Sequence, residues 1–263
     1  MEVIITKNYE EMSRVSAELI AREIKRKHDL ILGLATGDTP VGTYKGLVKL
    51  HKEEGLDFSK LTVFNLDEYI GLAPLHENSY NRFMWENLFS HVNITPENVY
   101  VPQGNTDDPE EFCRWYEEQI RDAGGIDLQI LGIGGDGHIA FNEPGSSFAS
   151  RTRIKALDKQ TIEDNSRFFE KIEDVPRFAI TMGIGTILEA RSIILIANGK
   201  KKANVCAQFI EGPVTSQITA SALQLHTHVT IVLDDEAASQ LKRREYYNWV
   251  RDNKHIVAKK IGR

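Results

Sequence analysis

Cysteine is scarce in this sequence. Only Cys113 and Cys206 occur among the 263 residues, and they lie far apart in helix-like stretches without a CxxC motif. A disulfide framework and a cysteine-built zinc site are therefore excluded, and both thiols are expected to be buried or unused.

Long apolar runs and an excess of basic residues are also lacking. No run approaches the length that spans a bilayer, and the stretch Met1–Thr6 is too short and too acidic for a secretory signal. The formal net charge of -6 argues against a nucleic-acid binder, although a local basic pocket for a small anion is compatible with it. We expect a soluble cytoplasmic protein without membrane or nucleic-acid partners.

Apolar residues make up 41% of the chain and prolines number only 8, so we expect a single domain over residues 1–263. Strands are expected at Val3–Ile5, Leu30–Leu34, Leu61–Leu66, Ile126–Leu131, Phe178–Met182, Ser192–Ala197 and Val229–Leu233. Helices are expected at Tyr9–Ile24 after an Asn8 cap, Ser79–Phe89, Pro109–Arg121, Gly185–Glu189, Lys200–Ile210 and Glu236–Ile256, with loop and short helix over 151–175. This alternation predicts an α/β fold: an open, mainly parallel, Rossmann-like sheet with helices on both faces.

The stretch Leu131–Pro144 holds four glycines together with Asp136, His138 and Glu143 directly after a predicted strand. Carboxylates that flank an imidazole can fix its tautomer and move its pKa toward the working pH, which suits general acid–base catalysis. The alternative is that the carboxylates cap turns beside a satisfied histidine. Three such residues together favour catalysis.

Gly132–Gly137 also satisfies the G-x-G-x-x-G pattern of dinucleotide-binding loops. That pattern should open a helix in the first βαβ unit of a chain. Here the pattern follows a strand late in the chain, and Pro144 and Gly145 come within seven residues of Gly137, where they would break a helix. The context argues against nucleotide binding.

Asp67 and Glu68 come directly after the predicted strand Leu61–Leu66. In a parallel sheet they lie at the same carboxyl edge as the glycine-rich loop, where open α/β sheets bind ligands. A carboxylate from this second strand could remove a carbon-bound proton while His138 handles oxygen-bound protons. The alternative, of equal weight, is that these carboxylates only cap a turn.

The turn Ala35–Pro40 predicts a helix start with Thr39 as N-cap and Pro40 at the first helical position. Its backbone amides and the Thr36 and Thr39 hydroxyls could hold a phosphate. Asp38 would repel a phosphate unless its side chain points away, and an ordinary capping turn is the alternative.

No metal is expected. His226 and His228 could share one face of a strand, but no third ligand is evident nearby. His138 also lacks the following Glu and the cysteine pair of the zinc nucleobase deaminases.

Four segments, Leu32–Pro40, Phe64–Tyr69, Gly134–Pro144 and Ser150–Lys155, carry a family resemblance. Through them the chain closely resembles the glucosamine-6-phosphate deaminases over nearly its whole length. The resemblance implies a sugar-phosphate isomerase type of α/β fold and a cofactor-independent hydrolase of amino-sugar catabolism. The implied reaction converts glucosamine 6-phosphate and water to fructose 6-phosphate and ammonia.

Carried over by motif position, the resemblance implies that Asp67 is the base at carbon 2 and that His138, flanked by Asp136 and Glu143, assists ring opening. The implied phosphate-binding residues are Thr36, Gly37, Asp38, Thr39, Arg167 and Lys202. Asp38 departs from the family's usual Gly or Ser. Lys202 is chosen from three consecutive lysines because the family's lysine follows its glycine by three residues.

The resemblance also implies a homo-oligomer, a hexamer activated by N-acetylglucosamine 6-phosphate through Ser146, Arg153 and Lys155, and a mobile lid near residues 157–180. Two rival functions stay open. One is a sugar-phosphate lactonase of related fold. The other is a non-catalytic sugar-phosphate sensor, for which no basic helix-turn-helix segment precedes Leu30.

Overall fold

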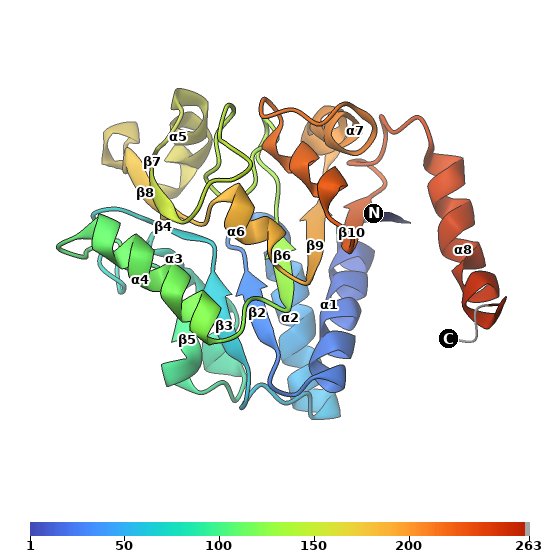
Figure 1. The fold of residues 1–263 in the computed structure, drawn as a ribbon, viewed down its shortest axis with the longest axis horizontal. Coiled ribbons are helices and arrows are strands. Elements are labelled where there is room, and N and C mark those ends of the chain that lie inside the picture. The colour runs from blue at the N-terminus through green and yellow to red at the C-terminus, as the bar shows by residue number, and fades with distance from the viewer. Residues whose placement is uncertain (261–263) are drawn as a thin grey trace.

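A seven-stranded parallel sheet forms the centre of the molecule (Figure 1). The computed structural model describes residues 1–260. The strands of this sheet are β1 (Glu2–Thr6), β2 (Ile31–Leu34), β3 (Thr62–Asn65), β5 (Val99–Tyr100), β6 (Leu128–Leu131), β9 (Ser192–Ala197) and β10 (Val229–Asp234). Their spatial order is β1-β10-β9-β6-β2-β3-β5, and every neighbouring pair is parallel. The predicted open parallel α/β sheet is confirmed, although the two-residue strand β5 was not anticipated.

Helices cover both faces of the sheet because alternate strand residues point to opposite sides. The helices are α1 (Tyr9–Arg26), α2 (Asp38–Glu54), α3 (Tyr80–Asn87), α4 (Pro109–Asp122), α5 (Lys159–Asn165), α6 (Ile184–Leu188), α7 (Ala203–Glu211) and α8 (Arg244–Lys260). One buried cluster joins Leu32 and Ile130 to α1, α2 and α3, and the other joins Leu131 and Ile193 to α4, α6 and α7. No helix of the described residues combines the length and the apolar character needed to cross a membrane.

A second, smaller sheet lies beyond the carboxyl edge of the first. It is antiparallel, in the order β4 (Asp67–Tyr69), β8 (Phe178–Thr181) and β7 (Arg153–Ala156). The expected strand near 178–182 therefore exists but stands outside the main sheet. The expectation of loop and short helix over 151–175 is wrong for β7, a half-exposed strand with a weak apolar signal, and right for the short helix α5.

Two helix starts differ from the sequence prediction. Helix α2 begins at Asp38 with Gly37 as its N-cap, because Gly37 adopts a positive φ of 99° that favours glycine. Thr39 is therefore not the cap, and its hydroxyl donates to Asn198 Oδ1 at 2.7 Å. Helix α8 begins at Arg244 rather than at residue 236. Just before this start, the Glu211 carboxylate accepts the backbone N–H groups of Lys242 and Arg243.

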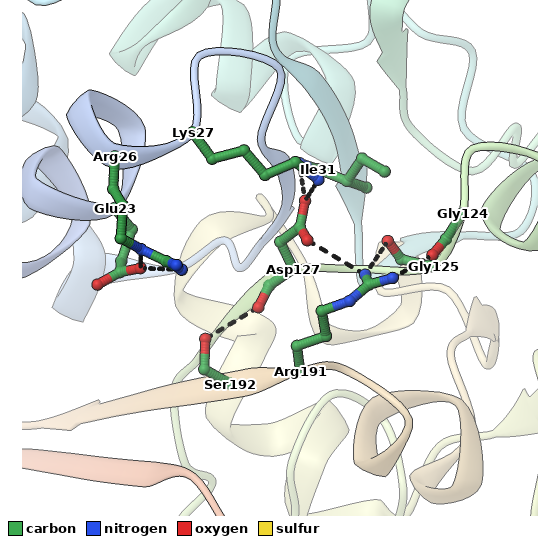
Figure 2. Close-up of polar contacts among 9 residues, drawn as sticks. All are labelled: Glu23, Arg26, Lys27, Ile31, Gly124, Gly125, Asp127, Arg191 and Ser192. Carbon is green, nitrogen blue, oxygen red and sulfur yellow. Dashed lines mark hydrogen bonds and ion pairs between the residues drawn. The ribbon is translucent and has the colours of Figure 1, made fainter.

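The amino ends of three neighbouring strands are tied together by Asp127 (Figure 2). Its Oδ2 accepts the Ile31 N–H at 2.8 Å and Lys27 Nζ at 2.6 Å, and its Oδ1 accepts from Arg191 at 3.1 Å. The Ser192 hydroxyl donates to the Asp127 carbonyl at 2.9 Å. This buried carboxylate thus fixes the starts of β2, β6 and β9 to one another.

Candidate active site

The predicted site motifs follow four strands that are adjacent in the sheet order β9-β6-β2-β3. Lys202 follows β9, the glycine-rich loop follows β6, the Thr36–Thr39 turn follows β2, and Asp67 follows β3. Because parallel strands end at the same edge, these segments meet outside the carboxyl ends, where open α/β sheets bind ligands. The sequence prediction that Asp67 lies at the same carboxyl edge as the glycine-rich loop agrees with this topology.

His138 lies between two carboxylates of its own loop. Its Nδ1 is 2.8 Å from Asp136 Oδ1 and 3.6 Å from Glu143 Oε2. Asp136 Oδ1 also accepts the His138 backbone N–H at 3.1 Å, which fixes the turn. A Cβ atom on Gly134 would lie 2.4 Å from the imidazole ring, so a glycine is required for the ring to lie against this backbone.

The electrostatics of this cluster favour a protonated imidazole. Burial by itself would lower the pKa of His138, but contacts with Asp136 and Glu143 outweigh it and raise the pKa to about 9. Burial acts to raise the pKa of each carboxyl, and the contact with His138 overcomes it, so both lie below their ordinary values. The three side chains have the spacing of a metal site, with ligand atoms within 4.8 Å of one another. A protonated imidazole is a proton donor and a poor metal ligand, so the arrangement is suited to proton transfer.

Asp67 is 6% exposed and opens the strand β4. Burial, and secondly the charge of Glu68, raise the pKa of Asp67 to about 8, while the nearby His138 acts in the opposite direction. Among the described residues, no lysine or arginine forms an ion pair with this carboxylate. Asp67 therefore combines a high proton affinity with burial, as a general base requires.

The β8 strand connects Asp67 to the glycine-rich loop. Thr181 pairs with Asp67 across the small sheet, and its hydroxyl accepts the Phe141 N–H at 3.0 Å. The Asn142 side chain donates to the Met182 carbonyl at 2.8 Å. The Phe141 ring packs 5.4 Å from that of Tyr69, centroid to centroid. These contacts hold the loop beside β4 and exclude water from Asp67.

The predicted phosphate-binding residues form a more exposed group. Asp38 lies at the start of α2 and pairs with Arg167 at 2.7 Å, with side chains 65% and 64% exposed. The Asp38 side chain therefore forms an ion pair with Arg167 instead of pointing only into solvent. Lys202 is partly buried, and burial lowers its pKa despite the opposing charges of Asp164 and Asp136, while the charge of Arg167 lowers it further. Lys202 and Arg167 thus act on the same region of the site.

The residues predicted for an effector site lie in two places. Ser146 is buried behind the active-site loop, where its hydroxyl donates to the Glu143 carbonyl at 2.7 Å. Arg153 and Lys155 lie two residues apart on β7 and so share one face of that strand. Within residues 1–260, no hydrogen bond or ion pair joins Ser146 to either of them.

Sequence reasoning gave no role to two polar groups at this site, Thr181 and Asn198, the acceptor of the Thr39 hydroxyl. Both lie at the ends of apolar strands and carry no local signal. Glu68 was named beside Asp67 as a carboxylate at the end of a strand, but its four accepted hydrogen bonds were not predicted. His226 has a structural role, since its Nε2 lies 2.7 Å from the Ala190 carbonyl.

A parallel α/β sheet with a histidine–carboxylate cluster and two cationic side chains beyond its carboxyl edge defines a class: Rossmann-like enzymes that act on small anionic substrates. Comparison with known proteins narrows this class. The model of the family described as glucosamine-6-phosphate isomerases/6-phosphogluconolactonases matches residues 7–232. The chain belongs to this family.

The relatives of high sequence identity are glucosamine-6-phosphate deaminases rather than 6-phosphogluconolactonases. A glucosamine-6-phosphate deaminase of Thermoanaerobacter pseudethanolicus is 54% identical over 239 residues, covering 91% of this chain and 94% of the relative. The glucosamine-6-phosphate deaminase 2 of Bacillus subtilis is 50% identical over 248 residues, covering 94% and 100%. A solved structure described as a monomeric glucosamine-6-phosphate deaminase superposes with a TM-score of 0.90 at 47% identity, covering 91% of this chain and 100% of that one. The 6-phosphogluconolactonase of Trypanosoma brucei, at 21% identity and a TM-score of 0.70, shares the fold.

Proposed function

We propose that this enzyme is a glucosamine-6-phosphate deaminase that converts glucosamine 6-phosphate and water to fructose 6-phosphate and ammonia. The observation that carries the proposal is the meeting of Asp67, buried without a cationic ion-pair partner among the described residues, with a histidine held between two carboxylates. The identities of about 50% to deaminases, against about 20% to lactonases, favour deamination over lactone hydrolysis.

The first step is opening of the pyranose ring. The His138 imidazolium donates a proton to the ring oxygen, and the neutral imidazole then takes up the proton of the carbon 1 hydroxyl as the aldehyde forms. Asp136 and Glu143 hold the imidazole in place and favour its protonated form. Removal of either carboxylate would lower the fraction of His138 that carries the proton.

The second step is isomerisation and loss of the amine. Asp67 removes the proton on carbon 2, which is acidic because it adjoins the carbonyl. The His138 imidazolium donates a proton to the oxygen on carbon 1, so that an enol forms between carbons 1 and 2. Return of a proton to carbon 1 leaves an imine at carbon 2, and water then replaces nitrogen, releasing ammonia. A base with a raised pKa is suited to this because its proton affinity is near the working pH.

The phosphate of the open-chain sugar is bound at the start of α2. The backbone N–H groups of Thr36–Thr39 are supported by the positive end of the helix dipole, and Lys202 and Arg167 add positive charge. The Arg167 guanidinium can bind the phosphate with all its N–H groups only after its ion pair with Asp38 breaks. Anchoring of this kind aligns carbon 2 with Asp67 and can contribute about 7 to 11 kcal/mol through positioning.

Residues 157–180 form the lid of a single domain in this proposal. The segment begins where the Asp158 N–H donates to Glu143 Oε1 at 3.1 Å, and it carries Arg167 to the phosphate turn. Its Phe169 ring packs 5.9 Å from that of Tyr69, centroid to centroid. A segment with contacts to both halves of the site can close over the substrate when phosphate replaces Asp38 on Arg167.

We further propose a cytoplasmic homo-oligomer with an effector site that includes Ser146, Arg153 and Lys155. Exposed Tyr246 and Trp249 on α8 offer apolar surface for contacts between subunits. The solved relative with a TM-score of 0.90 is described as monomeric. Analytical ultracentrifugation of this protein distinguishes a monomer from the proposed homo-oligomer. A sigmoidal saturation curve that N-acetylglucosamine 6-phosphate makes hyperbolic is the expected kinetic result, and a hyperbolic curve without response contradicts it.

The experiment that tests the reaction uses chelator-treated protein incubated with glucosamine 6-phosphate. Ammonia and fructose 6-phosphate are measured together and should appear in equal amounts. Absence of both products contradicts the proposal. Loss of activity on chelation, restored by a divalent metal, would assign the Asp136, His138 and Glu143 cluster to metal binding instead.

A further inference from the structure

Glu68 lies beside the proposed base on β4 and is one of the most deeply buried charged side chains, at 1% exposed. Neighbouring side chains of a strand point to opposite sides. Glu68 accordingly points away from the side that Asp67 occupies and reaches the start of α3, where Ser79 is the N-cap.

All four acceptor positions of the Glu68 carboxylate are used. Oε1 accepts the N–H groups of Tyr69 at 2.9 Å and Tyr80 at 3.1 Å. Oε2 accepts the Ser79 hydroxyl at 2.6 Å and the Asn81 N–H at 3.1 Å. Burial raises the pKa of Glu68, and these four hydrogen bonds oppose that rise. Burial leaves the pKa of Glu68 above its ordinary value, but three of the four partners are backbone N–H groups that can only donate, and the helix dipole also favours the ionised carboxylate.

We propose that Glu68 is a positioning residue for the reaction: its fixed negative charge behind β4 strengthens Asp67 as a base, and its hydrogen bonds hold β4 against α3. The inference rests on the proposed function, because it assumes that Asp67 takes the proton from carbon 2. It assigns a task to a buried charge that the chemical steps themselves do not use.

Few other charges compete for control of Asp67. The titratable groups whose charge acts on Asp67 or responds to it are Glu68, His138, Tyr69, Tyr80 and Tyr116. Burial raises the pKa of each tyrosine above its ordinary value, so all three are neutral near pH 7. Of the two remaining charges, Glu68 has the larger effect on Asp67, and it opposes His138. Without Glu68, the imidazolium would be the main charge acting on the base and would weaken it.

The test is the pH dependence of kcat/KM for glucosamine 6-phosphate, measured from about pH 5 to about pH 10. In Glu68→Gln the acid limb should move down by about one pH unit, and the plateau should fall about tenfold, because Asp67 becomes a weaker base. The matched control is Ser79→Ala, which removes the shortest hydrogen bond to Glu68 but keeps its charge. Its acid limb should stay at or above that of the unmodified protein.

A lower plateau with an unmoved acid limb in Glu68→Gln would overturn the inference and leave Glu68 a purely structural role. If Glu68→Gln does not fold, as judged by its thermal melt, Glu68→Asp takes its place. That variant retains the charge, so it should keep the acid limb despite a lower Tm, and a downward shift overturns the inference. An unmodified protein that releases no ammonia contradicts the proposed function itself, whereas an active protein with an unmoved limb contradicts only the role of Glu68.

Discussion

Asp67 and Asp127 are buried aspartates just beyond opposite edges of the main sheet, 6% and 8% exposed. Asp127 contacts Lys27, Arg191 and the Ile31 N–H, so its charge is neutralised where the strands begin. Asp67, where the strands end, has no such ion pair among the described residues, and its pKa is raised to about 8. At similar depth, the aspartate that is paired with cations is structural, and the one without such a pair has the raised proton affinity that the proposed base needs.

The comparison is tested most severely by Asp67→Asn. Turnover should fall by about 10³-fold to 10⁴-fold, because an amide cannot take the proton from carbon 2. Binding of fructose 6-phosphate should change little, since the phosphate residues are separate from β4. Isothermal calorimetry and an ammonia assay measure the two quantities. Turnover within about tenfold of the original would remove Asp67 from the role of base.

The same variant should change how stability depends on pH. The pKa of Asp67 rises from 3.8 to about 8 on folding, so its ionisation destabilises the folded protein progressively as the pH rises from about 4 through 8. Each pKa unit gained on folding corresponds to about 1.4 kcal/mol. Asp67→Asn removes this loss, so its Tm relative to the unmodified protein should increase between pH 5 and pH 8. A Tm difference that is constant with pH would contradict the raised pKa.

Asp127→Ala should show the reverse pattern. The change leaves the Ile31 N–H and Lys27 without this acceptor, removes the carboxylate partner of Arg191, and should destabilise the protein by about 3 kcal/mol in urea unfolding. Well below its Tm, kcat and KM should stay within about twofold, because Asp127 is at the far end of the sheet. A selective loss of kcat at unchanged stability would erase the contrast with Asp67.

The contrast also explains how far sequence reasoning reaches. The strands were predictable because Leu, Ile and Val runs mark buried positions, and the site motifs were predictable because each follows its strand directly. The strand β7 was missed because its four residues are only partly buried or exposed, and the cap of α2 was misplaced because a positive φ at Gly37 has no strong sequence signal. Asp38 and Arg167 are 129 positions apart, so only the folded chain reveals their pairing. The raised pKa of Asp67 likewise depends on neighbours from several elements.

Within the proton-transfer cluster, Glu143→Gln should lower kcat by about 10²-fold. Glu143 helps to keep His138 protonated, so its loss should also move the alkaline limb of the pH profile to lower pH. Glu163→Gln is a matched control on α5, where the carboxylate forms an ion pair with the exposed Lys159. An alkaline limb that stays in place would show that Asp136 alone sets the proton affinity of the imidazole.

The smallest effect is expected at Asp38, in the exposed half of the site. Asp38→Ser removes the carboxylate that competes with phosphate for Arg167, so the KM for glucosamine 6-phosphate should fall about threefold with kcat unchanged. The effect is small because both side chains are largely exposed and an exposed ion pair is weak. Added salt should reduce the difference between the two proteins, since it screens the pair that the substitution removes. A higher KM in Asp38→Ser would mean that Asp38 holds Arg167 in place for the phosphate, and the exposed half of the site would then be preorganised like the buried one.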